Sequence, residues 1–117
     1  MLILQPGSHF EWLTVLAEHK IGQVSSFPPG SMKLVEAGGK KVLIVNAEGT
    51  IHAIGNDCTH RGGPLNEGTL EGKVVTCPWH GGQFDVTTGK ATAPPPKSDS
   101  PAFKVKIQGN DVMLILP

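Results

Sequence analysis

The sequence predicts an all-β protein built on an antiparallel sandwich or barrel. Two observations support this fold class. The chain holds 15 glycines and 10 prolines in 117 residues, and both residue types disfavour long helices. From residue 21 to residue 116, short runs rich in Val, Ile and Leu alternate with turn sequences, as is typical of such folds. The length suits one domain with its own core.

Eight segments have the composition of strands, and turn sequences separate them. The predicted strands are residues 21–25, 32–36, 41–46, 50–54, 73–76, 83–86, 103–107 and 112–116, with turns at 27–30, 47–49, 87–89 and 108–111. Gly38 and Gly39 join the second and third strands as a tight hairpin, because glycine tolerates the positive φ angles that such a turn requires. Residues 93–96 include three prolines, which lack the N–H groups of a central strand, so a stiff loop is predicted there.

Residues 1–19 are predicted to be an N-terminal extension to a domain spanning residues 20–117. Ser8 and Glu11 fit a helical capping box, and the spacing of the apolar residues around them suits a short amphipathic helix. A strand over residues 12–16 is the competing prediction, because this stretch contains β-branched residues.

Charge and hydropathy exclude several classes of partner. The chain has 10 basic and 10 acidic residues, so no basic excess is present to neutralise nucleic-acid phosphates. No apolar run approaches the roughly 18 residues needed to cross a bilayer, and no secretory signal is evident. We therefore expect a cytoplasmic protein that binds neither nucleic acid nor membrane. Two cysteines are too few for a disulfide scaffold.

Both cysteines and two of the five histidines fall into two matched pairs. Cys58 and His60 are separated by one residue, and Cys77 and His80 follow after sixteen further residues with two residues between them. Such a set can hold one tetrahedral zinc ion. It can equally hold a [2Fe-2S] cluster with two thiolates on one iron and two imidazoles on the other. The spacing alone is compatible with both.

The residues around these pairs favour the cluster. Residues 58–64, Cys-Thr-His-Arg-Gly-Gly-Pro, and residues 77–85, Cys-Pro-Trp-His-Gly-Gly-Gln-Phe-Asp, resemble the two cluster-binding loops of the Rieske iron–sulfur family. The resemblance covers about residues 20–116. It implies the Rieske-type fold, in which an antiparallel base carries a small cluster-binding subdomain, here formed by residues 55–85. It also implies one Rieske-type [2Fe-2S] cluster per chain.

The resemblance assigns the ligands residue by residue. It implies that Cys58 and Cys77 hold the inner iron, while His60 and His80 hold the outer iron near the surface. The glycine pairs that follow each ligand pair would allow backbone N–H groups to approach the sulfur atoms closely. The other three histidines, His9, His19 and His52, have no such companions and are expected to be exposed to solvent.

Two departures from the respiratory branch of the family bear on redox potential. That branch has a disulfide between the positions of Gly63 and Trp79, and Ser and Tyr hydroxyls at the positions of Gly82 and Phe84. Those hydroxyls stabilise the reduced state, so their absence predicts a potential near the bottom of the Rieske range of roughly −150 to +300 mV.

The resemblance implies a Rieske ferredoxin, a one-electron carrier between a flavoprotein ferredoxin reductase and a terminal oxygenase. Transient docking is expected near His60 and His80. Because every ligand position on each iron would be filled, no catalytic residue is predicted and the chain is not expected to be an enzyme on its own. Three alternatives remain: a small subunit of an assimilatory nitrite reductase, a zinc-stabilised β interaction module, and a redox sensor using the same cluster.

Overall fold

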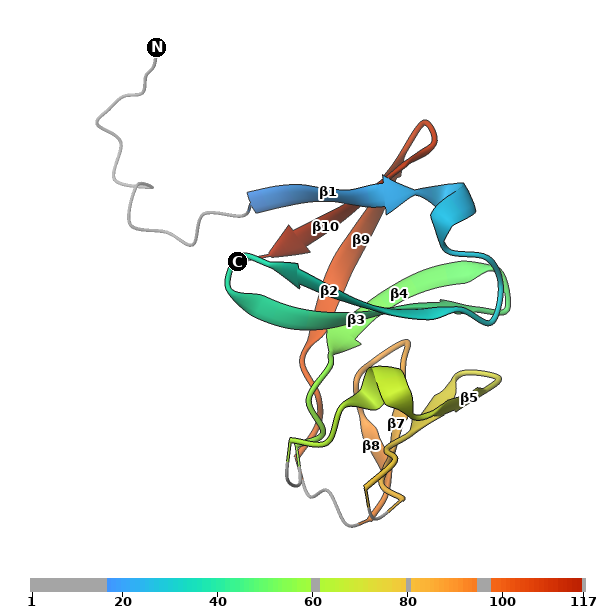
Figure 1. The fold of residues 1–117 in the computed structure, drawn as a ribbon, viewed down its shortest axis with the longest axis vertical. Coiled ribbons are helices and arrows are strands. Elements are labelled where there is room, and N and C mark those ends of the chain that lie inside the picture. Colours follow the sequence, from blue (N-terminus) through green and yellow to red (C-terminus); the bar gives the residue numbers. More distant parts are fainter. Residues whose placement is uncertain (1–16, 60–61, 80, 95–97, 117) are drawn as a thin grey trace, which may run out of the picture.

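The computed structural model describes residues 17–59, 62–79, 81–94 and 98–116, which form two antiparallel sheets (Figure 1). The strands are β1 (Ala17–Gln23), β2 (Met32–Ala37), β3 (Lys40–Ala47), β4 (Thr50–Gly55), β5 (Thr69–Glu71), β6 (Val74–Thr76), β7 (Gln83–Asp85), β8 (Ala91–Ala93), β9 (Ala102–Gln108) and β10 (Asp111–Leu116). Two 3₁₀ turns, η2 (Val24–Ser26) and η3 (Leu65–Glu67), complete the described elements. The all-β fold class is confirmed.

The two sheets differ in size and in the length of their strands. The larger, here called the base sheet, has the strand order β1-β10-β9-β4-β3-β2. The smaller, here called the small sheet, has the order β5-β6-β7-β8 and consists of three-residue strands. Figure 1 shows the small sheet below the base sheet, joined to it by the segments that follow β4 and precede β9.

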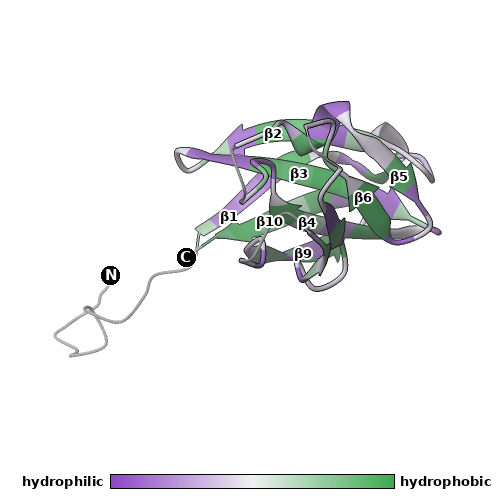
Figure 2. Cartoon of the chain, turned by 90° about the horizontal axis from the view of Figure 1, so that it is seen from below, coloured by the Kyte–Doolittle hydropathy of each residue, from purple (hydrophilic) through white to green (hydrophobic). Residues whose placement is uncertain are grey.

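Strand β3 supplies the core on both of its faces. Its residues Val42 to Val45 are fully buried in succession, and Figure 2 shows hydrophobic residues along most of β3 and β10. Leu43 and Val45 belong to the core that faces the small sheet, which also contains both cysteines. Val42 and Ile44 belong to a second core within the curled base sheet. Burial on both faces explains why this strand is continuously apolar instead of alternating.

The predicted hairpin turns form as the sequence indicates. Gly38 and Gly39, at φ 57° and 76°, connect β2 to β3, and the flanking Ala37 and Lys40 pair directly. The next turn, between β3 and β4, places Glu48 at φ 56°, an uncommon angle for a residue with a side chain. Asn46 supports this turn, because its Oδ1 accepts the Gly49 N–H at 2.9 Å.

Three segments differ from the prediction. The first strand begins at Ala17 instead of residue 21, and it ends in η2 because the chain turns there toward the buried Phe27. Strand β5 lies outside the eight predicted strands, and β8 includes Ala93, which was assigned to the proline loop. Both missed strands are three residues long and form through pairing with β6 and β7, so local composition does not reveal them.

The N-terminal segment has a limited description. The helix predicted near residues 8–17 and the alternative strand at residues 12–16 lie outside the described residues, apart from Ala17, which belongs to β1. Residues 17–19 pair with β10, and the division into an extension and a domain stays a prediction. In the described part of the chain, no helix is long and apolar enough to cross a membrane.

Candidate metal centre

The loop that follows β4 closes on itself immediately after its cysteine. The Cys58 N–H donates to the Gly63 carbonyl oxygen at 2.8 Å, and the Gly62 N–H donates to the Cys58 carbonyl oxygen at 2.7 Å. Gly62 has a φ of 76°, where a side chain would cost roughly 1–2 kcal/mol. A glycine is therefore favoured four residues after the cysteine.

The loop between β6 and β7 repeats this geometry. The Cys77 N–H donates to the Gly82 carbonyl oxygen at 2.7 Å, and Gly81 has a φ of 75°. In both loops the cysteine N–H thus reaches the carbonyl five residues later, and the fourth residue has a left-handed backbone. The two glycine pairs noted in the sequence therefore serve equivalent places in two matching loops, here called the first and second cysteine loops.

A buried asparagine anchors the first cysteine loop at its base. Asn56, 2% exposed, receives the Leu65 N–H on its carbonyl oxygen at 2.8 Å. Its Oδ1 accepts the Asn66 N–H at 3.0 Å, and its Nδ2 donates to Asn66 Oδ1 at 2.9 Å. Asp57 and Pro64 form a β-bridge between these contacts and the loop. Hydrogen bonds therefore fix both ends of the loop.

The second cysteine loop is held by the hairpin that it connects. Thr76 and Gln83 pair across β6 and β7, and Gln83 Nε2 donates to Thr76 Oγ1 at 3.2 Å. The loop therefore projects from the end of the small sheet, beside the first cysteine loop.

The two cysteine thiols meet in the core between the sheets. Cys58 and Cys77 are 3% and 2% exposed, and neither forms a disulfide. Burial raises the pKa of the Cys77 thiol; the Trp79 N–H, which donates to its Sγ at 3.4 Å, lowers that pKa, and the neighbouring Cys58 thiol raises it. A methyl group at Gly63 would lie 2.7 Å from the Cys77 sulfur. The two loops therefore approach each other too closely at this point for a side chain at residue 63.

Of the four predicted ligands, the structure brings the two cysteines together. His60 and His80 lie outside the described residues. Within the described ranges, no group of three or more His, Cys, Asp or Glu side chains is arranged to hold a metal ion. A pair of adjacent buried thiols fits the thiolate half of the expected cluster, because two thiolates hold one iron of a Rieske-type [2Fe-2S] cluster.

The proline loop is tied to the first cysteine loop through one hydroxyl. Thr59 Oγ1 donates to the Ser98 carbonyl oxygen at 2.6 Å. Nearby, the buried Ser100 donates from its N–H to the Gly89 carbonyl oxygen at 2.7 Å and from its Oγ to the Gly55 carbonyl oxygen at 3.2 Å. The chain is thereby fixed just after the prolines, although residues 95–97 lie outside the described residues.

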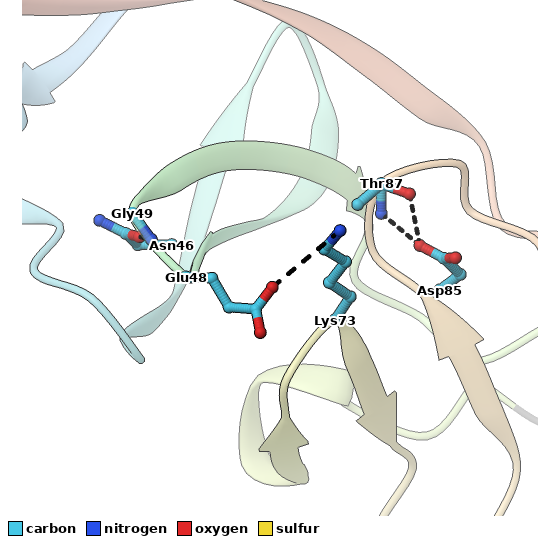
Figure 3. A network of polar contacts seen from close by, with 6 residues as sticks. All are labelled: Asn46, Glu48, Gly49, Lys73, Asp85 and Thr87. Atoms are coloured by element: carbon cyan, nitrogen blue, oxygen red, sulfur yellow. Dashed lines mark hydrogen bonds and ion pairs between the residues drawn. The ribbon is translucent and has the colours of Figure 1, made fainter.

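Charged groups beside the small sheet serve local structure (Figure 3). Asp85 Oδ1 accepts the Thr87 hydroxyl at 2.6 Å and the Thr87 N–H at 2.8 Å, and the hydroxyl contact is the main reason that the pKa of Asp85 is lowered. Lys73 lies 4.0 Å from Glu48 across the two sheets, but both side chains are well exposed, so this pair contributes little stability.

His19 and His52 are partly buried, not exposed as expected.

Sequence reasoning missed the residues that position the first cysteine loop. Asn56, Thr59 and Ser100 lie beside the ligand motif or before a strand, and their roles depend on partners 10 to 45 residues away. The available signal was the placement of Asn56 between a predicted strand and the cysteine, where a buried polar residue needs a partner.

Comparison with known proteins extends the match beyond the two loops. Residues 17–109 match the model of the Rieske [2Fe-2S] domain. Over 91 residues, the chain is 40% identical to the ferredoxin component of the naphthalene 1,2-dioxygenase/salicylate 5-hydroxylase systems of Ralstonia sp, covering 78% of this chain and 88% of that protein. Over 106 residues, it is 36% identical to the ferredoxin component of the Pseudomonas aeruginosa naphthalene 1,2-dioxygenase system, covering 91% and 96%.

Solved structures show the same fold. The Sphingomonas yanoikuyae B1 ferredoxin superposes with a TM-score of 0.81 at 29% identity, covering 86% of this chain and all of that one. A chain of the complex of reduced oxygenase and oxidized ferredoxin in carbazole 1,9a-dioxygenase gives 0.80 at 31% identity, covering 83% and 91%.

These findings decide between the two metals that the ligand spacing leaves open. The family match includes both cysteine loops and most of both sheets. The matched family is defined by a [2Fe-2S] cluster, and the relatives over this region are ferredoxins. The chain therefore belongs to the Rieske [2Fe-2S] domain family, and its cofactor is a Rieske-type [2Fe-2S] cluster.

Proposed function

We propose that this chain is a ferredoxin that carries single electrons to the terminal oxygenase of a multicomponent oxygenase system. The observation that carries the proposal is the pair of buried thiols in two matched loops at the end of a rigid β framework. Ferredoxin components of dioxygenase systems that match nearly the whole chain support it. The bound cluster supplies the chemistry, because it accepts and releases one electron at a time.

We propose that Cys58 and Cys77 ligate the inner iron and that His60 and His80 ligate the outer iron. The burial of both thiols supports the first assignment, since an iron held by them would lie inside the core. Each histidine follows its cysteine within three residues, in a loop whose ends are fixed by hydrogen bonds. The imidazoles would then provide the route for electrons between the cluster and a partner.

The chain's own residues set the potential through the contacts they make or lack. The Trp79 N–H on Cys77 Sγ stabilises negative charge on that sulfur. Gly82 and Phe84 are buried where the respiratory branch has hydroxyl donors, so they offer no side-chain hydrogen bond to the cluster or its ligands. These two positions support a potential near the bottom of the Rieske range.

We propose a flavoprotein ferredoxin reductase as the electron donor and docking of both partners near His60 and His80. The complex of an oxygenase with a similar ferredoxin supports an oxygenase as the acceptor. The chain would act in the cytoplasm as a component of the system and not as an enzyme on its own, because a cluster with all ligand positions filled offers no site for substrate.

Reconstitution tests this function. The purified chain, holding its cluster, is mixed with the reductase and oxygenase components of the naphthalene 1,2-dioxygenase system of Pseudomonas putida, a system whose ferredoxin is a relative. We expect electrons from the reduced reductase to reach the oxygenase only when the chain is present. Equal oxygenase reduction with and without the chain would contradict the carrier role.

A further inference from the structure

One large apolar side chain is exposed at the cysteine-loop end of the described structure. Trp79, in the second cysteine loop, is 48% exposed. The other large hydrophobic residues that are similarly exposed among the described ones, Val24, Leu34 and Ile107, belong to the base sheet or to η2 beside it. Trp79 is therefore separated from them and lies beside the candidate centre.

Packing fixes the half of Trp79 that is not exposed. A methyl group placed on Gly63 would lie 3.1 Å from two ring atoms of Trp79, so the indole rests directly on the backbone of the first cysteine loop. The backbone of Trp79 is held at the same time, because its main-chain N–H donates to Cys77 Sγ. An aromatic side chain held in this way loses little conformational freedom when its open face is covered, which favours binding.

Apart from Asp57 at the start of the first cysteine loop, the described residues of the two loops are uncharged. Residues 62–64, 77–79 and 81–82 are all uncharged, and Gly62, Pro78 and Gly81 are exposed in the same two loops. Interfaces of transient redox pairs are small, under about 1,200 Å², so a few residues must supply most of their free energy. Tryptophan is among the residues enriched at such energetic centres.

We propose that Trp79 is the main docking residue for the terminal oxygenase, and that its exposed indole face enters an uncharged apolar depression on the oxygenase next to the electron-accepting centre. This inference rests on the proposed function and names the residue through which the carrier recognises its acceptor. Docking at Trp79 places the acceptor beside the second cysteine loop, because the same residue contacts the Cys77 sulfur through its backbone.

The first experiment compares electron transfer by Trp79→Ala, Trp79→Phe and a control, Ile107→Ala. Ile107 is matched in exposure, at 49%, but lies in β9 of the base sheet. The reduced carriers are mixed with the oxygenase component of the naphthalene 1,2-dioxygenase system of Pseudomonas putida, and the second-order rate of their oxidation is measured. The EPR spectrum and midpoint potential of each variant are recorded beforehand.

We expect Trp79→Ala to lower the second-order rate by about tenfold or more, the usual loss at an energetic centre, and Trp79→Phe to lower it less. Ile107→Ala should transfer electrons at the wild-type rate. The EPR spectra and potentials should match the wild type, which separates docking from tuning of the cluster. Wild-type rates in both Trp79 variants would overturn the inference while the proposed function stands; a wild-type chain that reduces no oxygenase would overturn both.

A second measurement does not depend on the stability of the alanine variant. The chain has two tryptophans, Trp12 and Trp79, so incorporation of 5-fluorotryptophan gives two fluorine signals and Trp12→Phe leaves that of Trp79. Adding the same oxygenase in its oxidised form should shift or broaden the Trp79 signal at concentrations that support electron transfer. An unchanged Trp79 signal in a mixture that transfers electrons would overturn the inference.

Discussion

The base sheet and the small sheet are stabilised in different ways. The base sheet has strands of six to eight residues, tight hairpins and a strand, β3, that is buried on both faces. The small sheet has strands of three residues, and its loops are fixed by individual hydrogen bonds such as those of Asn56 and Thr59. Apolar burial and continuous strand pairing stabilise the first, whereas the second depends on a few specific contacts.

The difference shows how a stable framework supports a reactive site. Both cysteines belong to the core that β3 shares with the small sheet, so the framework contributes one wall of the site. The opposite wall consists of the short strands, whose own burial is too limited to order them independently. We therefore expect the cluster to contribute much of the stability of the small sheet and little of that of the base sheet, since a bound group stabilises the state that binds it.

The largest effect should follow removal of one thiolate. Cys58→Ser should abolish normal cluster content and release the small sheet, because a hydroxyl is a poor ligand for iron. Iron and sulfide analysis measures the first effect, and hydrogen exchange of β5–β8 compared with β3 and β10 measures the second. Val75→Ala, a buried neighbour in the same core, is the control and should keep its cluster. Wild-type iron and sulfide content in Cys58→Ser would contradict the ligand assignment.

Substitutions at two adjacent residues of β3 can distinguish the contributions of the two cores to cluster retention. Leu43→Ala and Ile44→Ala each remove a fully buried side chain and should lower the free energy of unfolding by about 2–5 kcal/mol. Leu43 faces the core that contains the cysteines, whereas Ile44 faces the interior of the base sheet. Iron release to a chelator should therefore be faster in Leu43→Ala than in Ile44→Ala. Equal release rates would show that the two regions behave as one.

The glycines of the first cysteine loop distinguish crowding from backbone strain. Gly63→Ala would place a methyl group 2.7 Å from the Cys77 sulfur, so we expect a stability loss of about 1–3 kcal/mol together with reduced cluster content. Gly62→Ala, at φ 76° with open space around it, should cost roughly 1–2 kcal/mol and retain its cluster. Thermal unfolding and iron content provide both values. Full cluster content in Gly63→Ala would contradict the close approach of the two loops.

The smallest effect concerns pH at the junction of the sheets. Burial lowers the pKa of His52 on β4, Asp85 opposes this shift and Lys73 adds to it. A histidine with a lowered folded-state pKa stabilises the fold when it is neutral, and that stability is lost as the pH falls below about 6.5. His52→Gln should therefore reduce the fall in melting temperature between about pH 8 and pH 5.5. An unchanged fall in melting temperature would show that His52 does not contribute to the pH dependence of stability.

The base sheet could be predicted from the sequence more fully than the small sheet. The paired glycines at 38–39 and the apolar run of β3 are local signals, and both features form as predicted. Strands β5 and β8 have no such signal, because their pairing depends on β6 and β7.

In the candidate site, too, local features could be predicted from the sequence and contacts between distant residues could not. The cysteine loops were evident because their ligands and glycines are close in sequence. The supporting contacts of Asn56 and Thr59 join residues 10 and 39 positions apart, which spacing within a motif cannot reveal. The packing of the Trp79 indole against Gly63, with 48% of the residue exposed, is likewise visible only in the structure.

The most direct test of the cluster and its ligands is pulsed EPR of the dithionite-reduced chain, produced with ¹⁵N-labelled histidine. We expect strong nitrogen couplings from two imidazoles bound to the reduced iron, and loss of one of them in His60→Cys or His80→Cys if the cluster assembles. A spectrum without histidine nitrogen coupling, or a colourless protein that holds one zinc ion, would contradict the central claim.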